Sequence, residues 1–163
     1  PKTGIISQQM RIFMDAFFSE INKNLSKIFE YSIEVLPSKP GKNLDYKFPL
    51  VVDGKDCGDI TTASEGQKEV IDLAFSLVLM KVMGLHEYPL YLDEIGATFD
   101  DRHRENLVRF IKNLLESKKI SQIFMISHYA EVTGGLVNNE AIVLHADNLT
   151  VIPSNANKHV TME

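Results

Sequence analysis

The sequence has very little cysteine, no excess of basic residues and no long apolar run. Cys57 is the single cysteine, which excludes an internal disulfide and a cysteine-based metal site. No apolar stretch approaches the roughly 20 residues that a membrane-spanning helix needs, so we expect no membrane contact. Lysine and arginine number 17 against 22 aspartates and glutamates, a formal charge of −5. Such a chain is a poor candidate for wrapping nucleic acid by itself.

What the sequence does contain is an ordinary globular composition. Its 163 residues are 44% hydrophobic and 24% charged, which favours one folded domain and excludes general disorder. The N-terminus shows neither an initiator methionine nor a secretory pattern, so we expect an excised piece of a soluble, intracellular protein. Residues 154–163 are polar, and we expect a flexible tail there.

The first 30 residues predict one long amphipathic helix. Apolar residues recur at steps of three and four over residues 4–30, with no proline or glycine after Gly4. This pattern fits a helix that packs on the core or the stub of a coiled coil. Strands are expected at 31–36 and 45–52, the second with an edge position or bulge at Pro49. Asp53-Gly54 then predicts a hairpin turn.

From residue 61 onward, helical and strand patterns alternate. Helices are expected at 65–84 and 101–117, strands at 89–92 and 120–126, and a closing hairpin at 141–145 and 149–152 across Asp147-Asn148. Alternation of this kind predicts an α/β core with a mostly parallel sheet and flanking helices. We therefore expect residues 31–153 to form the folded body of the chain.

Two adjacent carboxylates, Asp93 and Glu94, follow the apolar run 89–92. Open α/β sheets bind ligands at the carboxyl ends of their strands. In a nucleotide-hydrolysing site, an aspartate in this position holds Mg²⁺ and a following glutamate polarises the attacking water. An acidic turn after a strand is the alternative, so the pair indicates a site only in combination with other motifs.

A capping-box pattern, Ser64 with Gln67 three residues later, begins the helix 65–84. One interpretation is a plain helix cap. The other is an anion site, because a helix N-terminus with a serine hydroxyl binds phosphate well and Gly66 permits close backbone approach. The residues by themselves leave both interpretations open.

His128 and Asp100 also lie at the ends of predicted elements. His128 follows the strand 120–126, so it should emerge on the same rim of the sheet as Asp93 and Glu94. An isolated histidine after a strand is also a common surface residue. Asp100 is either the N-cap of the helix 101–117 or part of a turn that contacts another subunit.

Together, in this order and spacing, these segments resemble the motifs of ABC-type ATPases. The resemblance links residues 63–67 to the signature motif, 90–94 to Walker B, 95–100 to the D-loop and 126–128 to the H-loop. The long first helix and the β-layer before the signature are similar to the C-terminal lobe of a P-loop ABC ATPase head in the SMC, RecN and SbcC-like repair ATPases. In that class a coiled coil separates the two lobes.

The resemblance implies a site in which two heads, as a homodimer, sandwich ATP and Mg²⁺. Ser64, Gly66 and Gln67 would contact the nucleotide bound to the opposite head. Glu65 stands where the family usually has glycine, and it places a negative charge near the signature turn. That departure could weaken engagement of the two heads.

The resemblance also assigns roles to the strand-end residues. Asp93 would hold Mg²⁺, and Glu94 would activate water. His128 would contact the γ-phosphate on its own head, and Asp100 would couple the two sites across the dimer.

The P-loop pattern GxxxxGK[ST] does not occur in the sequence. The family's main phosphate cradle and its lysine would then lie elsewhere. We expect that this chain alone neither binds ATP tightly nor hydrolyses it. An N-terminal lobe carrying the P-loop, on the same protein or another chain, would be its necessary partner.

Three functional hypotheses remain open at this level. The first is an ATPase head of an SbcC-like double-strand-break repair and recombination protein that acts on DNA with a nuclease subunit. The second is an SMC-like head whose ATP cycle opens and closes a structural DNA tether. The third, favoured by Glu65 alone, is a degenerate head that serves only for dimerisation or partner binding. The resemblance implies a cytoplasmic protein of a bacterial or phage-infected cell, or a nuclear one.

Overall fold

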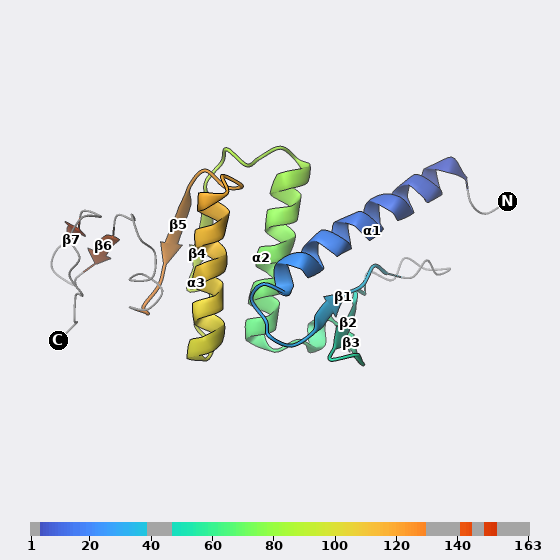
Figure 1. Ribbon diagram of the computed structural model, residues 1–163, viewed down its shortest axis with the longest axis horizontal. Coiled ribbons are helices and arrows are strands. Elements are labelled where there is room, and N and C mark those ends of the chain that lie inside the picture. Colours follow the sequence, from blue (N-terminus) through green and yellow to red (C-terminus); the bar gives the residue numbers. More distant parts are fainter. Residues whose placement is uncertain (1–3, 39–46, 130–140, 145–148, 153–163) are drawn as a thin grey trace.

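The computed structural model describes residues 4–38, 47–129, 141–144 and 149–152. The expected tail at 154–163 and the turn at Asp147-Asn148 lie outside the described residues. The elements are α1 (Ile5–Leu25), β1 (Ile33–Val35), β2 (Pro49–Val52), β3 (Lys55–Asp59), a 3-10 turn η1 (Ile60–Thr62), α2 (Glu65–Val82), β4 (Leu90–Asp93), α3 (Asp101–Glu116), β5 (Ile123–Ile126), β6 (Ala141–Leu144) and β7 (Leu149–Ile152). Figure 1 shows their arrangement. In the part of the chain so described, no helix is both long and apolar enough to cross a bilayer.

Helix α1 has a buried C-terminal half and an exposed N-terminal half. Phe18 and Ile21 belong to the core, and Phe18 contacts Phe75 of α2 with ring centres 5.8 Å apart. Ile5 and Ile6 are about four-fifths exposed, at 79% and 84%, and this end of α1 projects away from the body (Figure 1). The core interpretation therefore holds for the second half, and the apolar first half remains compatible with a coiled-coil stub.

The first helix ends earlier than the sequence pattern predicts. It was expected to continue to residue 30, but α1 ends at Leu25 and the chain turns through Ser26. The turn buries Ile28 and Phe29 in the core, and the amide of Phe29 donates to Leu25 O at 3.0 Å. Apolar periodicity continues through this turn because its residues also face the core, so periodicity alone could not mark the end of the helix.

The small β-layer is a three-stranded antiparallel sheet in the order β1-β2-β3. Asp53 and Gly54 have φ angles of 48° and 74°, the left-handed values that a two-residue hairpin turn requires. The register shifts between Pro49 and Val51, so the predicted bulge at Pro49 is confirmed. The third strand, β3, was not predicted because its residues are mostly polar and exposed.

The second half confirms the predicted alternation of helices and strands. Strands β4 and β5 pair in parallel, with Asp93 opposite Ile126. Strands β6 and β7 form the predicted antiparallel hairpin. The class is α/β, but the parallel part of the described residues is only this two-stranded sheet, because the other described strands pair in antiparallel fashion.

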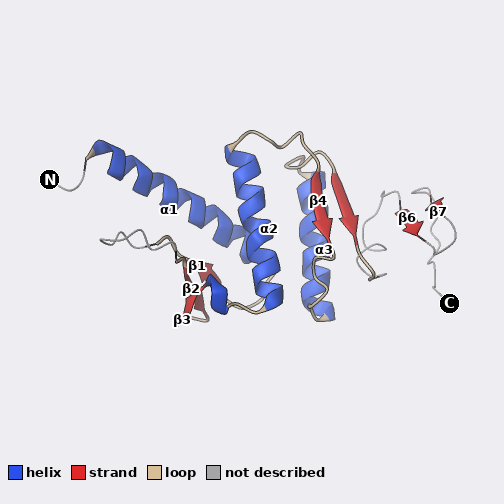
Figure 2. Ribbon diagram, turned by 180° about the vertical axis from the view of Figure 1, so that it is seen from behind, coloured by secondary structure: helices blue, strands red, loops and turns tan. Residues whose placement is uncertain are grey.

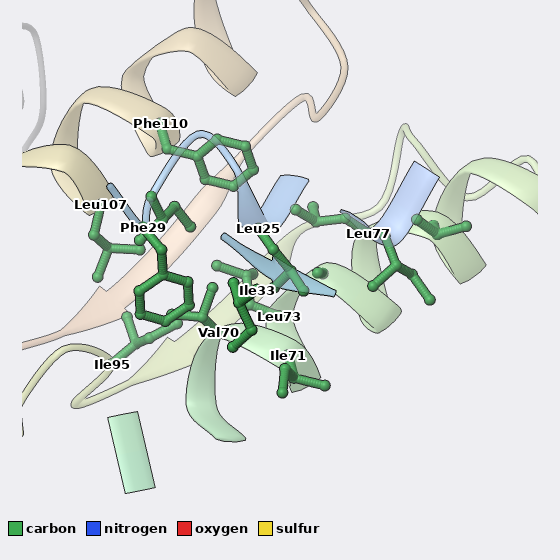
Figure 3. Close-up of a cluster of buried hydrophobic side chains, with 14 of the residues drawn as sticks. Leu25, Phe29, Ile33, Val70, Ile71, Leu73, Leu77, Ile95, Leu107 and Phe110 are labelled. Atoms are coloured by element: carbon green, nitrogen blue, oxygen red, sulfur yellow. The ribbon is translucent and has the colours of Figure 1, made fainter. Parts of the chain in front are cut away.

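One hydrophobic cluster contains buried residues of α1, β1, β2, α2, β4 and α3, and Ile123 and Met125 of β5 pack against it. The shared feature of α2 and α3 is a buried apolar face, supplied by Val70, Leu73, Ala74, Leu77, Leu107, Phe110, Ile111 and Leu114. Figure 3 shows these helices meeting Leu25, Phe29 and Ile33. The core thereby fixes the position of the strands and helix ends that carry the candidate motifs.

The parallel sheet buries one face and leaves the other open. Leu90 and Leu92 of β4 are buried, whereas Tyr91 between them is 71% exposed. Tyr91 stacks on Phe124 of β5, with ring centres 5.2 Å apart, and Ile126 is also exposed. In both views α3 lies beside this strand pair (Figures 1 and 2). In the described part of the chain, this sheet therefore has an uncovered apolar face.

The side chain of Asn22 joins helix α1 to the β-layer by two hydrogen bonds. Asn22 Oδ1 accepts from the amide of Val35 at 2.9 Å, and its Nδ2 donates to the carbonyl of Val35 at 3.0 Å. Val35 pairs with Leu50 of β2 in the sheet register, so Asn22 satisfies backbone groups of β1 that would otherwise form an open edge.

We expect Asn22→Ala to lower the free energy of unfolding by about 2 kcal/mol, because it removes two hydrogen bonds and leaves strand groups unpaired. Urea unfolding followed by circular dichroism measures this change. Ser19→Ala, at an exposed position of the same helix, is the control and should stay within about 0.5 kcal/mol of the unsubstituted chain. Equal effects of the two substitutions would contradict the prediction.

Candidate functional site

The parallel pairing of β4 and β5 brings Glu94 and His128 together. The amide of Glu94 donates to Ile126 O at 2.9 Å, which extends the ladder one residue beyond β4. Just past this point, His128 Nε2 lies 2.8 Å from Glu94 Oε1. The predicted meeting of these two residues on one rim is confirmed. Both side chains are accessible, at 51% for Glu94 and 76% for His128, so water competes with the pair and it can open readily.

The backbone at Glu94 turns sharply. Its φ angle is 50°, an uncommon left-handed value for a residue other than glycine. The amide of Ala97 then donates to Glu94 O at 3.0 Å, and that of Phe99 donates to Gly96 O at 3.1 Å. We call residues 94–100 the rim loop. Strained conformations of this kind cluster at functional sites, so the turn is consistent with a functional role for Glu94.

Asp93 lies beside this pair as an exposed residue at the last position of β4. Among the described residues, no three His, Cys, Asp or Glu side chains gather in a group that could hold a metal ion. Mg²⁺ in nucleotide sites needs only one or two protein carboxylates, the remaining ligands being water and phosphate. Asp93 therefore fits the role of a single protein ligand to such an ion.

The start of α2 is a complete capping box. Ser64 Oγ accepts from the amide of Gln67 at 3.3 Å, and Gln67 Oε1 accepts from the amide of Ser64 at 2.9 Å. Gln67 Nε2 also donates to the hydroxyl of Tyr31 at 3.1 Å. The cap interpretation is confirmed, and the polar atoms of Gln67 are engaged within the fold. The Ser64 hydroxyl hydrogen is not used by the cap, so it can still donate to an anion.

Glu65 points outward at the same helix end. Its side chain is 76% exposed and lies 3.1 Å from Lys68 Nζ. The charge that departs from the family pattern is therefore directed to solvent and partly balanced by a neighbour. This geometry weakens the hypothesis of a degenerate head, which rested on the charge of Glu65.

Gly66 links this helix end to the rim loop. A Cβ atom built on Gly66 would lie 2.6 Å from Phe99 Cε1 and 2.8 Å from Thr98 Oγ1. These separations are shorter than atomic contact allows, so only glycine lets α2 lie this close to the loop. The structure thus brings the signature-like and D-loop-like segments into direct contact.

Asp100 caps α3, as the first of its two interpretations predicts. Its Oδ1 accepts from the amide and from the Nδ1 of His103, both at 2.8 Å. These hydrogen bonds, the backbone one first and the side-chain one second, lower the pKa of the Asp100 carboxyl. The carboxylate is exposed, so the cap leaves its second oxygen accessible to a partner.

The sequence patterns missed three residues that hold the rim loop in place: Glu69, Arg104 and Tyr129. Arg104 carried a detectable signal, because it occupies the apolar face of α3 with Leu107 and Ile111 and is only 8% exposed. A buried arginine needs partners, and it finds them in the rim loop. Glu69 and Tyr129 follow no pattern in the sequence that would mark them.

The chain is similar to known proteins in sequence and in fold. No protein-family model matches the chain. Over 85 residues, 52% of this chain, the sequence is 32% identical to the DNA double-strand break repair Rad50 ATPase of Methanococcus maripaludis. The chain spans 8% of the length of that relative.

Solved structures match over most of the chain. A chain from work on ATP-driven dimerization and DNA-stimulated activation of SMC ATPases aligns at a TM-score of 0.61 with 22% identity, covering 88% of both chains. The Smc head domain with an extended coiled coil, derived from Pyrococcus furiosus and bound to the C-terminal domain of ScpA, aligns at 0.63 with 23% identity, covering 88% of this chain and 35% of that one. The chain has the fold of an SMC/Rad50-like ABC-type ATPase head.

We expect Gly66→Ala to lower the free energy of unfolding by about 1–3 kcal/mol, because the added methyl group forces the rim loop and α2 apart. Urea unfolding measures the change. Gly4→Ala places the same methyl group where nothing lies within 4 Å, and it should cost less than about 0.5 kcal/mol. A Gly66→Ala variant as stable as Gly4→Ala would show that the close contact does not exist in solution.

The lowered pKa of Asp100 predicts a specific acid sensitivity. Its contribution to stability is fully present above the unfolded carboxyl pKa of about 3.9 and is lost as the pH falls below it through the lower folded pKa. Asparagine is as good a helix N-cap as aspartate. The melting temperature of the Asp100→Asn variant should therefore fall less over this acid range than that of the unsubstituted chain. Asp15→Asn, at an exposed position of α1, is the control. Parallel acid profiles for all three proteins would refute the assignment.

Proposed function

We propose that this chain is the C-terminal half of an ATP-hydrolysing head of an SbcC-like DNA double-strand-break repair ATPase that acts with a nuclease partner. The observation that carries the proposal is the Glu94–His128 contact of 2.8 Å beside Asp93 at the ends of two parallel strands. The sequence similarity to a Rad50 ATPase supports the repair branch.

The rim residues have the chemistry that phosphoryl transfer to water needs. Asp93 would hold Mg²⁺, which neutralises charge on the phosphates when it is bound. Glu94 would orient and polarise the attacking water. His128 holds Glu94 at 2.8 Å, and its exposed ring is free to turn toward a γ-phosphate.

The residues at the helix ends suit contacts across a dimer of heads. Ser64 presents a hydroxyl at the positive end of α2. Gly66 is buried against the rim loop, so it would act there by letting this helix end lie close to the loop. Gln67 secures the cap and would support this contact indirectly through the fold. Asp100 keeps one carboxylate oxygen accessible and would meet the opposite head.

The partners are inferred from the exposed apolar face of the chain and from its negative charge. An N-terminal lobe with the P-loop would cover the exposed face at Tyr91, Phe124 and Ile126, because aromatic and aliphatic side chains in one patch favour burial. DNA would be bound through the complete complex, because the chain carries a formal charge of −5. The functional unit would be a homodimer of complete heads together with the nuclease subunit.

A second candidate is an SMC-like head that serves as a structural DNA tether without a nuclease. The structural matches to SMC heads, at TM-scores of 0.61 and 0.63, favour it. Co-purification of a nuclease from the native source distinguishes the two candidates, because only the repair head requires one.

The central prediction concerns Glu94 in a head assembled from this chain and the lobe that carries the P-loop. ATP hydrolysis should appear only after that lobe is added. Glu94→Gln should reduce turnover by about 10³-fold, because the amide cannot act as a base, and it should retain ATP-bound dimers. Phosphate release and size-exclusion chromatography with ATP measure the two effects.

Glu87→Gln makes the same chemical change at an exposed position before β4, and it should leave turnover unchanged. If the folded, assembled head hydrolyses no ATP and Glu94→Gln traps no dimer, the chain is instead the degenerate module that serves for dimerisation or partner binding.

A further inference from the structure

Three side chains from three different elements hold the backbone of the rim loop. Glu69 of α2 accepts from the amide of Gly96 at 2.9 Å. Tyr129, after β5, donates its hydroxyl to the carbonyl of Ala97 at 3.0 Å. Arg104 of α3 donates to the carbonyl of Phe99 at 2.7 Å. Each of these elements carries or adjoins a different candidate motif.

The Glu69 hydrogen bond connects α2 to the loop at a point that also packs closely against α3. Gly96 has a φ angle of +83°, and an added Cβ would lie 2.9 Å from Leu107 Cδ2 of α3. A carboxylate accepting from a backbone amide in a part-buried position is a strong hydrogen bond. Since Gly66 of the same helix also touches the loop, a shift at the Ser64 end of α2 must move the loop with it.

The hydrogen bond of the Tyr129 hydroxyl to Ala97 connects the His128 segment to the same loop. The guanidinium of the buried Arg104 lies 3.9 Å from the centre of the Tyr129 ring, close enough for a cation–π contact that fixes the ring. The amide of Tyr129 donates to Ser127 Oγ at 3.1 Å, which folds the chain tightly around His128. Movement of His128 is therefore transmitted through Tyr129 to Ala97.

We propose that Glu69 and Tyr129 are positioning residues that couple the Ser64 end of α2 and the His128 segment through the rim loop. The loop begins at Glu94, so the orientation of that carboxylate depends on both attachments. This proposal rests on the ATPase function proposed above. It predicts that the two residues act on turnover rather than on nucleotide affinity, because their side chains bond the rim loop and not a residue assigned here to the nucleotide.

Kinetics of the assembled head test the coupling. Glu69→Ala and Tyr129→Phe should each lower kcat about tenfold with KM for ATP changed less than about twofold. Glu69→Gln retains an acceptor for the Gly96 amide and should restore most of the activity. The double variant should lose less than the product of the single losses, because both act through one loop.

Asp72→Ala and Tyr88→Phe remove the same kinds of groups at exposed positions, and they serve as matched controls. An active head in which Glu69→Ala and Tyr129→Phe match these controls overturns the coupling and leaves the ATPase proposal intact. An inactive unsubstituted head overturns the ATPase proposal, and the coupling is then judged on this chain alone.

The coupling can also be tested on this chain alone, by recording the amide NMR signals of the full chain without nucleotide. Tyr129→Phe should shift the signals of residues 64–67 as well as those of the rim loop, and Glu69→Ala should shift the signal of His128. Tyr88→Phe and Asp72→Ala should shift neither set. Changes confined to the immediate neighbours of each substitution would overturn the coupling, whatever the activity of the head.

Discussion

The parallel pairing of β4 with β5 is the constraint on which the rest of the site depends. Its register places Asp93 opposite Ile126, and one further ladder hydrogen bond fixes the backbone of Glu94. From there Glu94 and His128 have only one or two residues in which to diverge, and they meet at 2.8 Å. A slip of the register by one residue would direct alternate side chains to the opposite face and separate the acid from the histidine.

Helices α2 and α3 place their N-terminal ends next to that rim. Helix α2 brings the Ser64 cap against the rim loop through Gly66, and α3 begins where that loop ends, at the Asp100 cap. Because caps satisfy backbone groups that otherwise need water, these helix ends can lie close to the loop at little cost. The loop consequently touches every candidate motif among the described residues, so its attachments connect those motifs to one another.

Much of this arrangement could be predicted from residue patterns. The alternation after residue 61 predicted α2, β4, α3 and β5, and the placement of Asp93, Glu94 and His128 on one rim followed from strand polarity. The misses have physical causes. The end of α1 was misplaced because Ile28 and Phe29 continue the apolar pattern beyond the helix, and β3 was missed because its strand conformation comes from pairing with β2 rather than from its own exposed polar residues.

The sequence by itself determined the class of fold, the order of the motif-like segments, both helix caps and the hairpin turn at Asp53-Gly54, because these depend on local propensity and on spacing along the chain. Only the tertiary structure decided that Glu65 faces solvent, that Gly66 abuts Phe99, and that Glu69, Arg104 and Tyr129 converge on one loop. The last three side chains bond loop residues 5 to 32 positions away in the sequence, and these contacts exist only because a common core sets the distance and direction between the elements.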